Sequence, residues 1–250
     1  MKQEFKDHFS DRSDDYARYR PVYPVALFAY LASITPEHMR AWDCATGTGQ
    51  AALMLADYYS EVIATDASAS QIENCIAKNG VRYQVALAET TDIETKSVDL
   101  VTVAQAVHWF DLPAFTIEVN RVLKPGGVLA VWTYNLTKIT TIVDQIVNDL
   151  YGSVLAGYWP EERKFIETEY ADIRFPFQDQ SSPKFQMAQQ WNLSQLIGYL
   201  STWSAVKRYQ TENGVNPVEK IYSQLSKAWG QADKQRTVIW PLTVKIWKTI

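Results

Sequence analysis

The sequence Ala41-Trp42-Asp43-Cys44-Ala45-Thr46-Gly47-Thr48-Gly49-Gln50-Ala51-Ala52 decides the fold. It reads as a buried strand, a glycine loop and the first turn of a helix. Gly47 and Gly49 lack a Cβ, so the chain can turn tightly there and a ligand can approach the backbone closely. A helix that starts after the loop directs its unpaired N–H groups and positive dipole end at the loop, which favours an anionic group. A tight turn without a ligand is the alternative interpretation.

Strand and helix patterns alternate on both sides of this loop. The expected strands are residues 40–45, 62–65, 81–87, 98–104 and 128–134. The expected helices are residues 50–59, a helix from the capping box at Ser68 to Asn79-Gly80, and a helix that begins at Asp111-Leu112-Pro113. Such alternation predicts an α/β fold, a Rossmann-like, doubly wound and mostly parallel sheet with helices on both faces. Ligands of such sheets bind at the carboxyl ends of the strands.

Beyond residue 150 the pattern becomes helical and aromatic, and it ends in an alternating run at residues 238–247. We therefore expect one domain over residues 1–250. Its expected parts are an N-terminal lid arm and helix (1–36), a cofactor-binding core (37–150), a helical and aromatic cap (151–235) and a last strand (236–250). Pro241 inside that strand predicts an edge position or a bulge, because proline cannot donate to a ladder.

Composition excludes several classes of protein. The chain has 250 residues, 47% of them hydrophobic, which suffices for one large core. Lys and Arg number 24 against 28 Asp and Glu, and no basic run stands out, so a nucleic-acid partner is not expected. No stretch reaches the roughly 18 apolar residues that span a bilayer, and the first residues lack a signal-peptide core. A cytoplasmic protein without a membrane contact is expected. The 2 cysteines and 3 histidines show no ligand spacing, so no metal is expected.

The glycine loop narrows the ligand to an adenosine-bearing cofactor. Residues 47–52 satisfy the G-x-G-x-x-A form of the dinucleotide fingerprint. Asp66 follows Gly47 by 19 residues, at the end of the second expected strand, where a carboxylate can accept hydrogen bonds from a ribose diol. The alternative for Asp66 is a favourable charge at a helix N-terminus. These residues do not choose between a nicotinamide cofactor and S-adenosylmethionine.

Four further stretches carry a resemblance to a known family. Residues 43–49 resemble the D-x-G-x-G-x-G motif of class I S-adenosylmethionine-dependent methyltransferases, and residues 98–111 resemble the motif of their fourth strand. Residues 118–127 resemble their R-V-L-K-P-G-G approach to the fifth strand. Residues 19–24 resemble the Y-R-P-x-Y-P segment of the type 11 branch, and within it of the trans-aconitate-methyltransferase-like proteins.

The sequence departs from that family at two positions. Ala45 replaces the first glycine of the loop and fits there if its φ is negative. Leu87 stands where many relatives carry an acid that reaches the adenine amine, so adenine recognition would fall to Glu89 or to backbone groups.

The resemblance implies methyl transfer by in-line displacement from S-adenosylmethionine, with S-adenosylhomocysteine as product, to a small-molecule acceptor such as a carboxylic acid. The cofactor-binding residues that it implies, together with the N-terminal arm, are Tyr16, Arg20, Ala45, Gly47, Thr48, Gly49, Gln50, Asp66, Ala67, Ala88, Glu89, Gln105 and Ala106.

On the acceptor side, His108 and Tyr16 are the catalytic candidates. His108 would act as a general base for a hydroxyl or amine acceptor, and a packed, hydrogen-bonded histidine is the alternative. The candidate acceptor pocket consists of His108, Trp109, Tyr199, Trp203 and Arg208. A monomer or homodimer is expected. Two other functions stay open, an NAD-dependent oxidoreductase and a cofactor-binding module without turnover.

Overall fold

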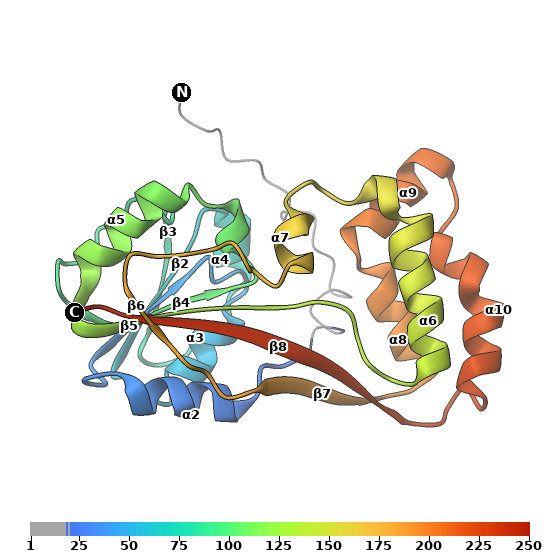
Figure 1. Cartoon of the computed structure of the whole chain (residues 1–250), viewed down its shortest axis with the longest axis horizontal. Helices are drawn as coiled ribbons and strands as arrows, with labels where there is room; N and C mark the ends of the chain where they lie inside the picture. Colours follow the sequence, from blue (N-terminus) through green and yellow to red (C-terminus); the bar gives the residue numbers. More distant parts are fainter. Residues whose placement is uncertain (1–18, 20) are drawn as a thin grey trace.

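The computed structural model describes Tyr19 and residues 21–250, with an eight-stranded sheet as their framework (Figure 1). The strand order is β3-β2-β1-β4-β5-β8-β6, and β7 also pairs with β8. The strands are β1 (Arg40–Cys44), β2 (Glu61–Asp66), β3 (Val81–Val85), β4 (Val98–Ala104), β5 (Leu123–Tyr134), β6 (Gln178–Gln180), β7 (Phe185–Trp191) and β8 (Arg236–Lys248). The strands β1 to β5 are parallel, and β8 is antiparallel to its neighbours. The doubly wound, mostly parallel sheet is thus confirmed.

The helices divide between the two faces of the sheet and a cap at one end (Figure 1). Their bounds are α2 (Val25–Ile34), α3 (Gln50–Leu55), α4 (Ala69–Glu73), α5 (Leu112–Val122), α6 (Thr141–Asp149), α7 (Arg163–Glu167), α8 (Leu193–Ser201), α9 (Ser204–Asn213) and α10 (Pro217–Trp229), with short helical turns η1 (Val107–Trp109), η2 (Leu150–Val154) and η3 (Ala156–Tyr158). Figure 1 shows α2 and α5 on opposite sides of the sheet, and α6, α8, α9 and α10 gathered beyond one end of it. The helix predicted from Asp111 is confirmed, because the Asp111 carboxylate caps α5 through the Ala114 N–H at 3.1 Å.

Alternating side chains of the central strands build two separate cores. On β1, Ala41 packs with the helices α2 and α3, whereas Trp42 packs with α5. On β5, Trp132 belongs to the first core and Val131 to the second. This alternation is what a sheet covered on both faces requires. The first core continues without a break into the cap helices, so the cap is part of the same packed body.

The segment after α6 connects the cap to the other face of the sheet. Its first residues, such as Leu150 and Leu155, pack in the core shared with the cap. Farther along, Ile166, Tyr170 and Phe175 pack in the core on the α5 side. In Figure 1, α7 accordingly lies between the sheet and the cap. This crossing brings α7 and Tyr170 to the edge of the sheet at which β4 and β5 end.

Several local expectations were wrong. The helix after Ser68 ends at Glu73 rather than at Asn79-Gly80, although Ser68 does cap it by accepting from the Gln71 N–H. The strand expected over residues 128–134 begins at Leu123, and its pairing with β4 is irregular between the pairs Val98/Leu123 and Leu100/Val128. The expected helix over residues 50–59 likewise ends at Leu55, so α3 and α4 are both shorter than their sequence patterns suggested, since tertiary contacts overrule local propensity.

Pro241 lies inside β8, which is an interior strand rather than an edge strand. It pairs with Gln186 of β7 on one side. On the other side the pairing with β5 reaches only the Leu242–Tyr134 pair, so the missing N–H of Pro241 breaks no hydrogen bond to β5. At Pro241, β8 therefore pairs with β7 alone, as the proline predicted, although β8 as a whole is not an edge strand.

Candidate functional site

The glycine loop connects the end of β1 to α3 through three left-handed residues. Ala45, Gly47 and Gly49 have φ values of +55°, +58° and +87°. The condition that Ala45 would need a negative φ was therefore wrong, and its methyl group is accommodated in a conformation that costs an alanine about 1–2 kcal/mol. Gly49 is buried, and a Cβ on it would lie 2.7 Å from the Tyr83 hydroxyl. Within the described part of the chain, a Cβ on Gly47 would meet Gln71 Oε1 alone, at an ordinary contact distance of 3.7 Å.

Two carboxylates fix the shape of this loop. Asp43, at the end of β1, accepts from the Thr46 hydroxyl at 2.5 Å and from the Thr102 hydroxyl at 2.8 Å. Asp66, the last residue of β2, accepts from the backbone N–H of Gly47 at 2.8 Å and of Ser68 at 2.9 Å. These two bonds fix the Asp66 carboxylate against the turn that Gly47 makes. The loop is therefore held by charged hydrogen bonds rather than by packing alone.

Burial raises the pKa of Asp43 from 3.8 to about 6, and the neighbouring charge of Asp66 adds to the shift. The folded state thus binds the Asp43 proton more tightly than the unfolded chain does. The stabilisation from that proton is fully present below pH 3.8 and is lost as the pH rises through 6. Relative to the Asp43→Asn variant, we expect the free energy of unfolding of the native protein to increase by roughly 2–3 kcal/mol between pH 7 and pH 4. Urea unfolding of both proteins across this range measures the difference; a constant difference would contradict the raised pKa.

The remaining predicted cofactor residues lie around the loop. Gln50, the first residue of α3, donates from its side chain to the Pro21 carbonyl at 3.0 Å, which connects the end of the N-terminal segment to the loop. Ala67 follows Asp66, and Thr48 is exposed at the tip of the loop. Beyond β3, Ala88 is buried, and Glu89 accepts from the Asp111 N–H at 3.0 Å. Tyr16 and Arg20 lie outside the described residues.

The end of β4 is strained and cross-linked to β5. Gln105 has a φ of +59°, which places a second non-glycine left-handed residue beside Ala45 at the point where the strand order reverses. Its side-chain amide donates to the Tyr134 carbonyl at 3.0 Å and accepts from the Thr133 hydroxyl at 2.6 Å. Ala106 follows it and is buried. The Gln105 side chain is therefore fixed against the end of β5.

His108 lies one turn beyond Gln105, in η1. Its Nδ1 is 2.9 Å from the Tyr170 hydroxyl, and its ring packs against Trp109 with centroids 4.8 Å apart. Burial, together with the positive charge of Arg163, lowers the pKa of His108 from 6.5 to about 3. The imidazole is therefore neutral near pH 7, with a weakly basic nitrogen.

Arg163 begins α7 and points at the same edge. Its Nε donates to the Tyr151 hydroxyl at 3.0 Å, and its Nη2 donates to Asn135 Oδ1 at 3.3 Å. The guanidinium carbon lies 5.3 Å from the centre of the Tyr151 ring and 4.9 Å from that of Trp159. No carboxylate pairs with Arg163 among residues 19 and 21–250. A half-buried guanidinium with neutral partners keeps donors for an anion.

Aromatic side chains of the cap adjoin Arg163. Trp203 packs against both Trp159 and Tyr151, with centroids 5.6 and 6.1 Å apart, and against Tyr199 at 6.0 Å. Tyr199 itself is buried and accepts from Trp240 Nε1 at 3.1 Å. The structure thus brings the predicted residues Tyr199 and Trp203 together with Arg163, which in turn lies within electrostatic reach of His108.

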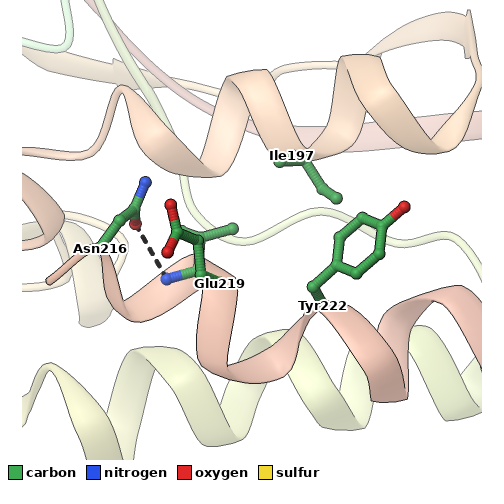
Figure 2. Close-up of a pocket in the computed structure, with 5 residues that line it drawn as sticks. Ile197, Asn216, Glu219 and Tyr222 are labelled. Carbon is green, nitrogen blue, oxygen red and sulfur yellow. Dashed lines mark hydrogen bonds between the residues drawn. The ribbon is translucent and has the colours of Figure 1, made fainter.

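Arg208 lies elsewhere on the cap. It is exposed on α9 and donates to the Tyr158 carbonyl at 3.3 Å. A groove between α8 and α10, shown in Figure 2, is lined by Ile197, Asn216, Val218, Glu219 and Tyr222. None of these five residues was predicted for the site, and none contributes to the contacts of Arg163 or His108. The candidate functional side chains described above therefore lie at the carboxyl edge of the sheet.

These features are those of a doubly wound protein with a glycine loop and an acidic residue, Asp66, at the carboxyl edge of the sheet. The order of the strands reverses there, between the paired strands β1 and β4. A family model described as a methyltransferase domain matches residues 42–131. A methyltransferase of Dictyostelium discoideum is 36% identical over 239 residues, 94% of this chain and 91% of its own. The structure of a type II methyltransferase from Anaeromyxobacter dehalogenans is 39% identical, with a TM-score of 0.88, and the match covers 92% of this chain and 97% of that one. An S-adenosylmethionine-dependent methyltransferase of Saccharomyces cerevisiae is 23% identical, with 82% and 83% covered.

The chain therefore belongs to the class I S-adenosylmethionine-dependent methyltransferases of type 11, and S-adenosylmethionine is its cofactor. This assignment rules out the two alternatives left open by the sequence, a nicotinamide-dependent oxidoreductase and a cofactor-binding module without turnover. The trans-aconitate-like subgroup stays a prediction. No helix within the described part of the chain is both long and apolar enough to cross a bilayer.

Sequence reasoning missed four residues of this edge, Arg163, Tyr170, Thr133 and Asn135. Thr133 and Asn135 stand at the end of a predicted strand, so the rule that placed Gln105 at the edge could have found them. Arg163 and Tyr170 belong to a segment without regular periodicity, and nothing in its pattern indicates that it crosses from the cap to the other face.

Proposed function

We propose that the protein transfers a methyl group from S-adenosylmethionine to a small molecule that carries an acidic group, such as a carboxylic acid. The observation that carries the acceptor class is Arg163, a half-buried guanidinium with aromatic neighbours and no carboxylate partner among the described residues. The bound cofactor supplies an electrophilic methyl group, and the protein aligns the acceptor for in-line displacement. Alignment of two reactants is worth about 7–11 kcal/mol, so no covalent intermediate with the protein is required.

The proposed cofactor contacts follow the strand ends. Asp66 would accept hydrogen bonds from the ribose, and the loop at Ala45, Gly47, Thr48 and Gly49 would lie against the amino-acid end, beside Gln50. Ala67, Ala88 and Glu89 would border the adenosine, and Gln105 with Ala106 would lie near the sulfonium. Tyr16 and Arg20 complete the proposal from the N-terminal segment. The bonds that the Asp66 carboxylate accepts from the Gly47 and Ser68 N–H groups hold it beside the loop, which supports this fit.

Arg163 replaces Arg208 as our candidate for the acidic group. Its charge already lowers the pKa of His108, so its positive potential reaches the acceptor side. A carboxylate bound there would form charge-assisted, bidentate hydrogen bonds, which are the strongest that a side chain offers. Trp109, Tyr199 and Trp203 would form the walls, and aromatic faces tolerate the positive charge of a sulfonium.

His108 is the candidate that contacts the reacting group. A carboxylate acceptor is already ionised at pH 7 and needs no base. For a hydroxyl or amine acceptor, the neutral His108 would take up the hydrogen bond, although its low pKa makes it a weak base. The single-domain division and a cytoplasmic monomer or homodimer remain part of the proposal.

The Asp66→Ala variant tests the cofactor site. We expect the affinity for S-adenosylhomocysteine to fall at least about tenfold, because charged hydrogen bonds contribute about 1.5–3 kcal/mol each. Isothermal titration calorimetry measures the affinity, and thermal melting checks the fold. The matched control is Asp57→Ala, which removes an exposed carboxylate paired with Lys78. Equal affinities in the Asp66 and Asp57 variants would refute the ribose role of Asp66.

A methylation screen tests the acceptor class. Small carboxylic acids and matched neutral amides are incubated with labelled cofactor, using the native protein and the Arg163→Met variant. We expect methylation of acids but not of amides, and we expect Arg163→Met to raise KM for the acid more than it lowers kcat. Turnover of the amides alone would overturn the acidic acceptor class.

A further inference from the structure

Arg163 and Glu167 lie on one face of α7 and yet form no direct ion pair with each other. They are the first and last residues of that helix, at the i,i+4 spacing at which opposite charges ordinarily meet. In the structure the Tyr151 hydroxyl stands between them. It accepts from Arg163 Nε at 3.0 Å and donates to the Glu167 carboxylate. This carboxylate is thus kept one hydroxyl away from the guanidinium.

An uncommon helical turn brings Tyr151 to this position. Tyr151 belongs to η2, a turn of π-helix that directly follows α6. Such turns are rare, and many of them occur at functional sites. The Tyr151 carbonyl accepts from Trp159 Nε1 at 3.1 Å, and the two rings pack with their centroids 4.7 Å apart. The turn therefore holds the faces of both rings beside the Arg163 guanidinium.

Both polar partners of Arg163 are neutral. Burial raises the pKa of Tyr151 to about 12, although the positive charge of Arg163 opposes the shift, so the hydroxyl keeps its proton at pH 7. Asn135, just after β5, accepts from Arg163 Nη2 through its amide oxygen at 3.3 Å. A hydroxyl and an amide satisfy N–H donors without cancelling the positive charge.

These partners engage Nε and Nη2 and leave the Nη1 side of the guanidinium. Within residues 19 and 21–250, no hydrogen bond from Arg163 Nη1 is present. A carboxylate that binds on this side gains charge-assisted hydrogen bonds. It also meets a positive charge that no ion pair has already compensated, and an internal ion pair would reduce that attraction. The neutral partners therefore matter as much to an anion as the arginine does.

We propose that Tyr151 and Asn135 are specificity-determining residues, which position Arg163 and reserve its charge for the acidic group of the methyl acceptor. The inference rests on the proposed function and deepens it. It assigns the preference for an anionic over a neutral acceptor to the partners of Arg163 as well as to Arg163 itself. Aspartate has nearly the shape of asparagine, so exchanging the amide of residue 135 for a carboxylate would convert the anion site into an internal ion pair.

The Asn135→Asp variant tests this with a probe that needs no methyl transfer. The probe is benzoate, whose ring can pack against Trp159, and benzamide is its neutral counterpart. Isothermal titration calorimetry in the presence of S-adenosylhomocysteine measures both affinities. We expect the native protein to prefer benzoate. We expect Asn135→Asp to bind benzoate at least about tenfold more weakly, which corresponds to one charge-assisted hydrogen bond, with little change for benzamide.

The neutral Asn135→Ser variant is the matched control, and it should keep the preference for benzoate. The affinity of all three proteins for S-adenosylhomocysteine checks that the variants are folded. Equal binding of benzoate and benzamide by the native protein would overturn the proposal. Absence of benzoate binding, or an unchanged benzoate affinity in Asn135→Asp, would overturn it as well.

The Tyr151→Phe variant tests the hydroxyl. Its removal lets Glu167 pair directly with Arg163, so the affinity for benzoate should fall. Glu167→Gln alone should bind benzoate nearly as the native protein does, and the double variant Tyr151→Phe/Glu167→Gln should recover much of the lost affinity. A folded double variant that binds no better than Tyr151→Phe would overturn this role of Tyr151. If Tyr151→Phe fails to fold, the variants of Asn135 decide the proposal.

Kinetics with a methylated acid separate this inference from the proposed function. We expect Asn135→Asp to raise KM for the acid more than it lowers kcat, because the variant weakens binding of the acidic group. Methylation of acids with an unchanged KM in Asn135→Asp would contradict the inference and leave the proposed function standing. A protein that binds benzoate as expected but methylates no acid would contradict the proposed function and leave the anion site standing.

Discussion

The Gly49→Ala variant is expected to lose about 2–4 kcal/mol of stability and to bind S-adenosylhomocysteine at least about tenfold more weakly. The φ of +87° places an alanine in a region that costs about 1–2 kcal/mol. The new Cβ would also lie 2.7 Å from the Tyr83 hydroxyl and 3.0 Å from its ring, and such overpacking typically costs about 1–3 kcal/mol. Thermal melting should show a decrease of roughly 5–15 °C.

Two further variants separate the causes. Gly214→Ala has a similar φ of +71°, and no atom of the described residues lies within 4 Å of the added Cβ, so it measures the backbone cost alone. Replacing Tyr83 by leucine in the Gly49→Ala background should recover part of the loss by relieving the contact. If Gly49→Ala melts no lower than Gly214→Ala, the close packing of Tyr83 over the loop is refuted.

The Asp99→Ala variant is expected to lose about 3–5 kcal/mol, although this residue lies at the opposite end of β4 from the cofactor site. Asp99 is fully buried and accepts from the backbone N–H groups of Met39 and Arg40, both at 2.9 Å, and from Lys124 Nζ at 2.8 Å. Removal of the carboxylate leaves these donors without their acceptor, which is the costly way to break a buried ion pair. Chemical denaturation measures the loss.

Lys124→Met is the matched control for Asp99. It removes the same ion pair from its more exposed partner and leaves Asp99 its two backbone donors. We expect a smaller loss than in Asp99→Ala and near-native affinity for S-adenosylhomocysteine in both folded proteins. A greater loss in Lys124→Met would show that the ion pair, rather than the two backbone hydrogen bonds, accounts for the role of Asp99.

The core of the fold could be predicted because its signals are local. The strand β4 was predicted with its observed bounds, since an apolar run of that length between turn residues has few other solutions. The start of α5 was predicted from Asp111, whose side chain caps the helix. The ends of helices were predicted less accurately. The helix α4 ends at Glu73 rather than at Asn79-Gly80, because packing decides where a short helix stops.

The sequence by itself predicted the side of the site that we propose for the cofactor. Glycines at 47 and 49, the acid at 66 and the strand ends lie within one short stretch of chain, and their spacing alone places them at one edge of a parallel sheet. Only the tertiary structure decided the acceptor side. The contact between His108 and Tyr170 joins residues 62 positions apart, and Arg163 reaches Asn135 across 28. No local periodicity constrains such pairs, because they arise from the segment after α6 crossing from the cap core to the α5 face over the ends of β4 and β5.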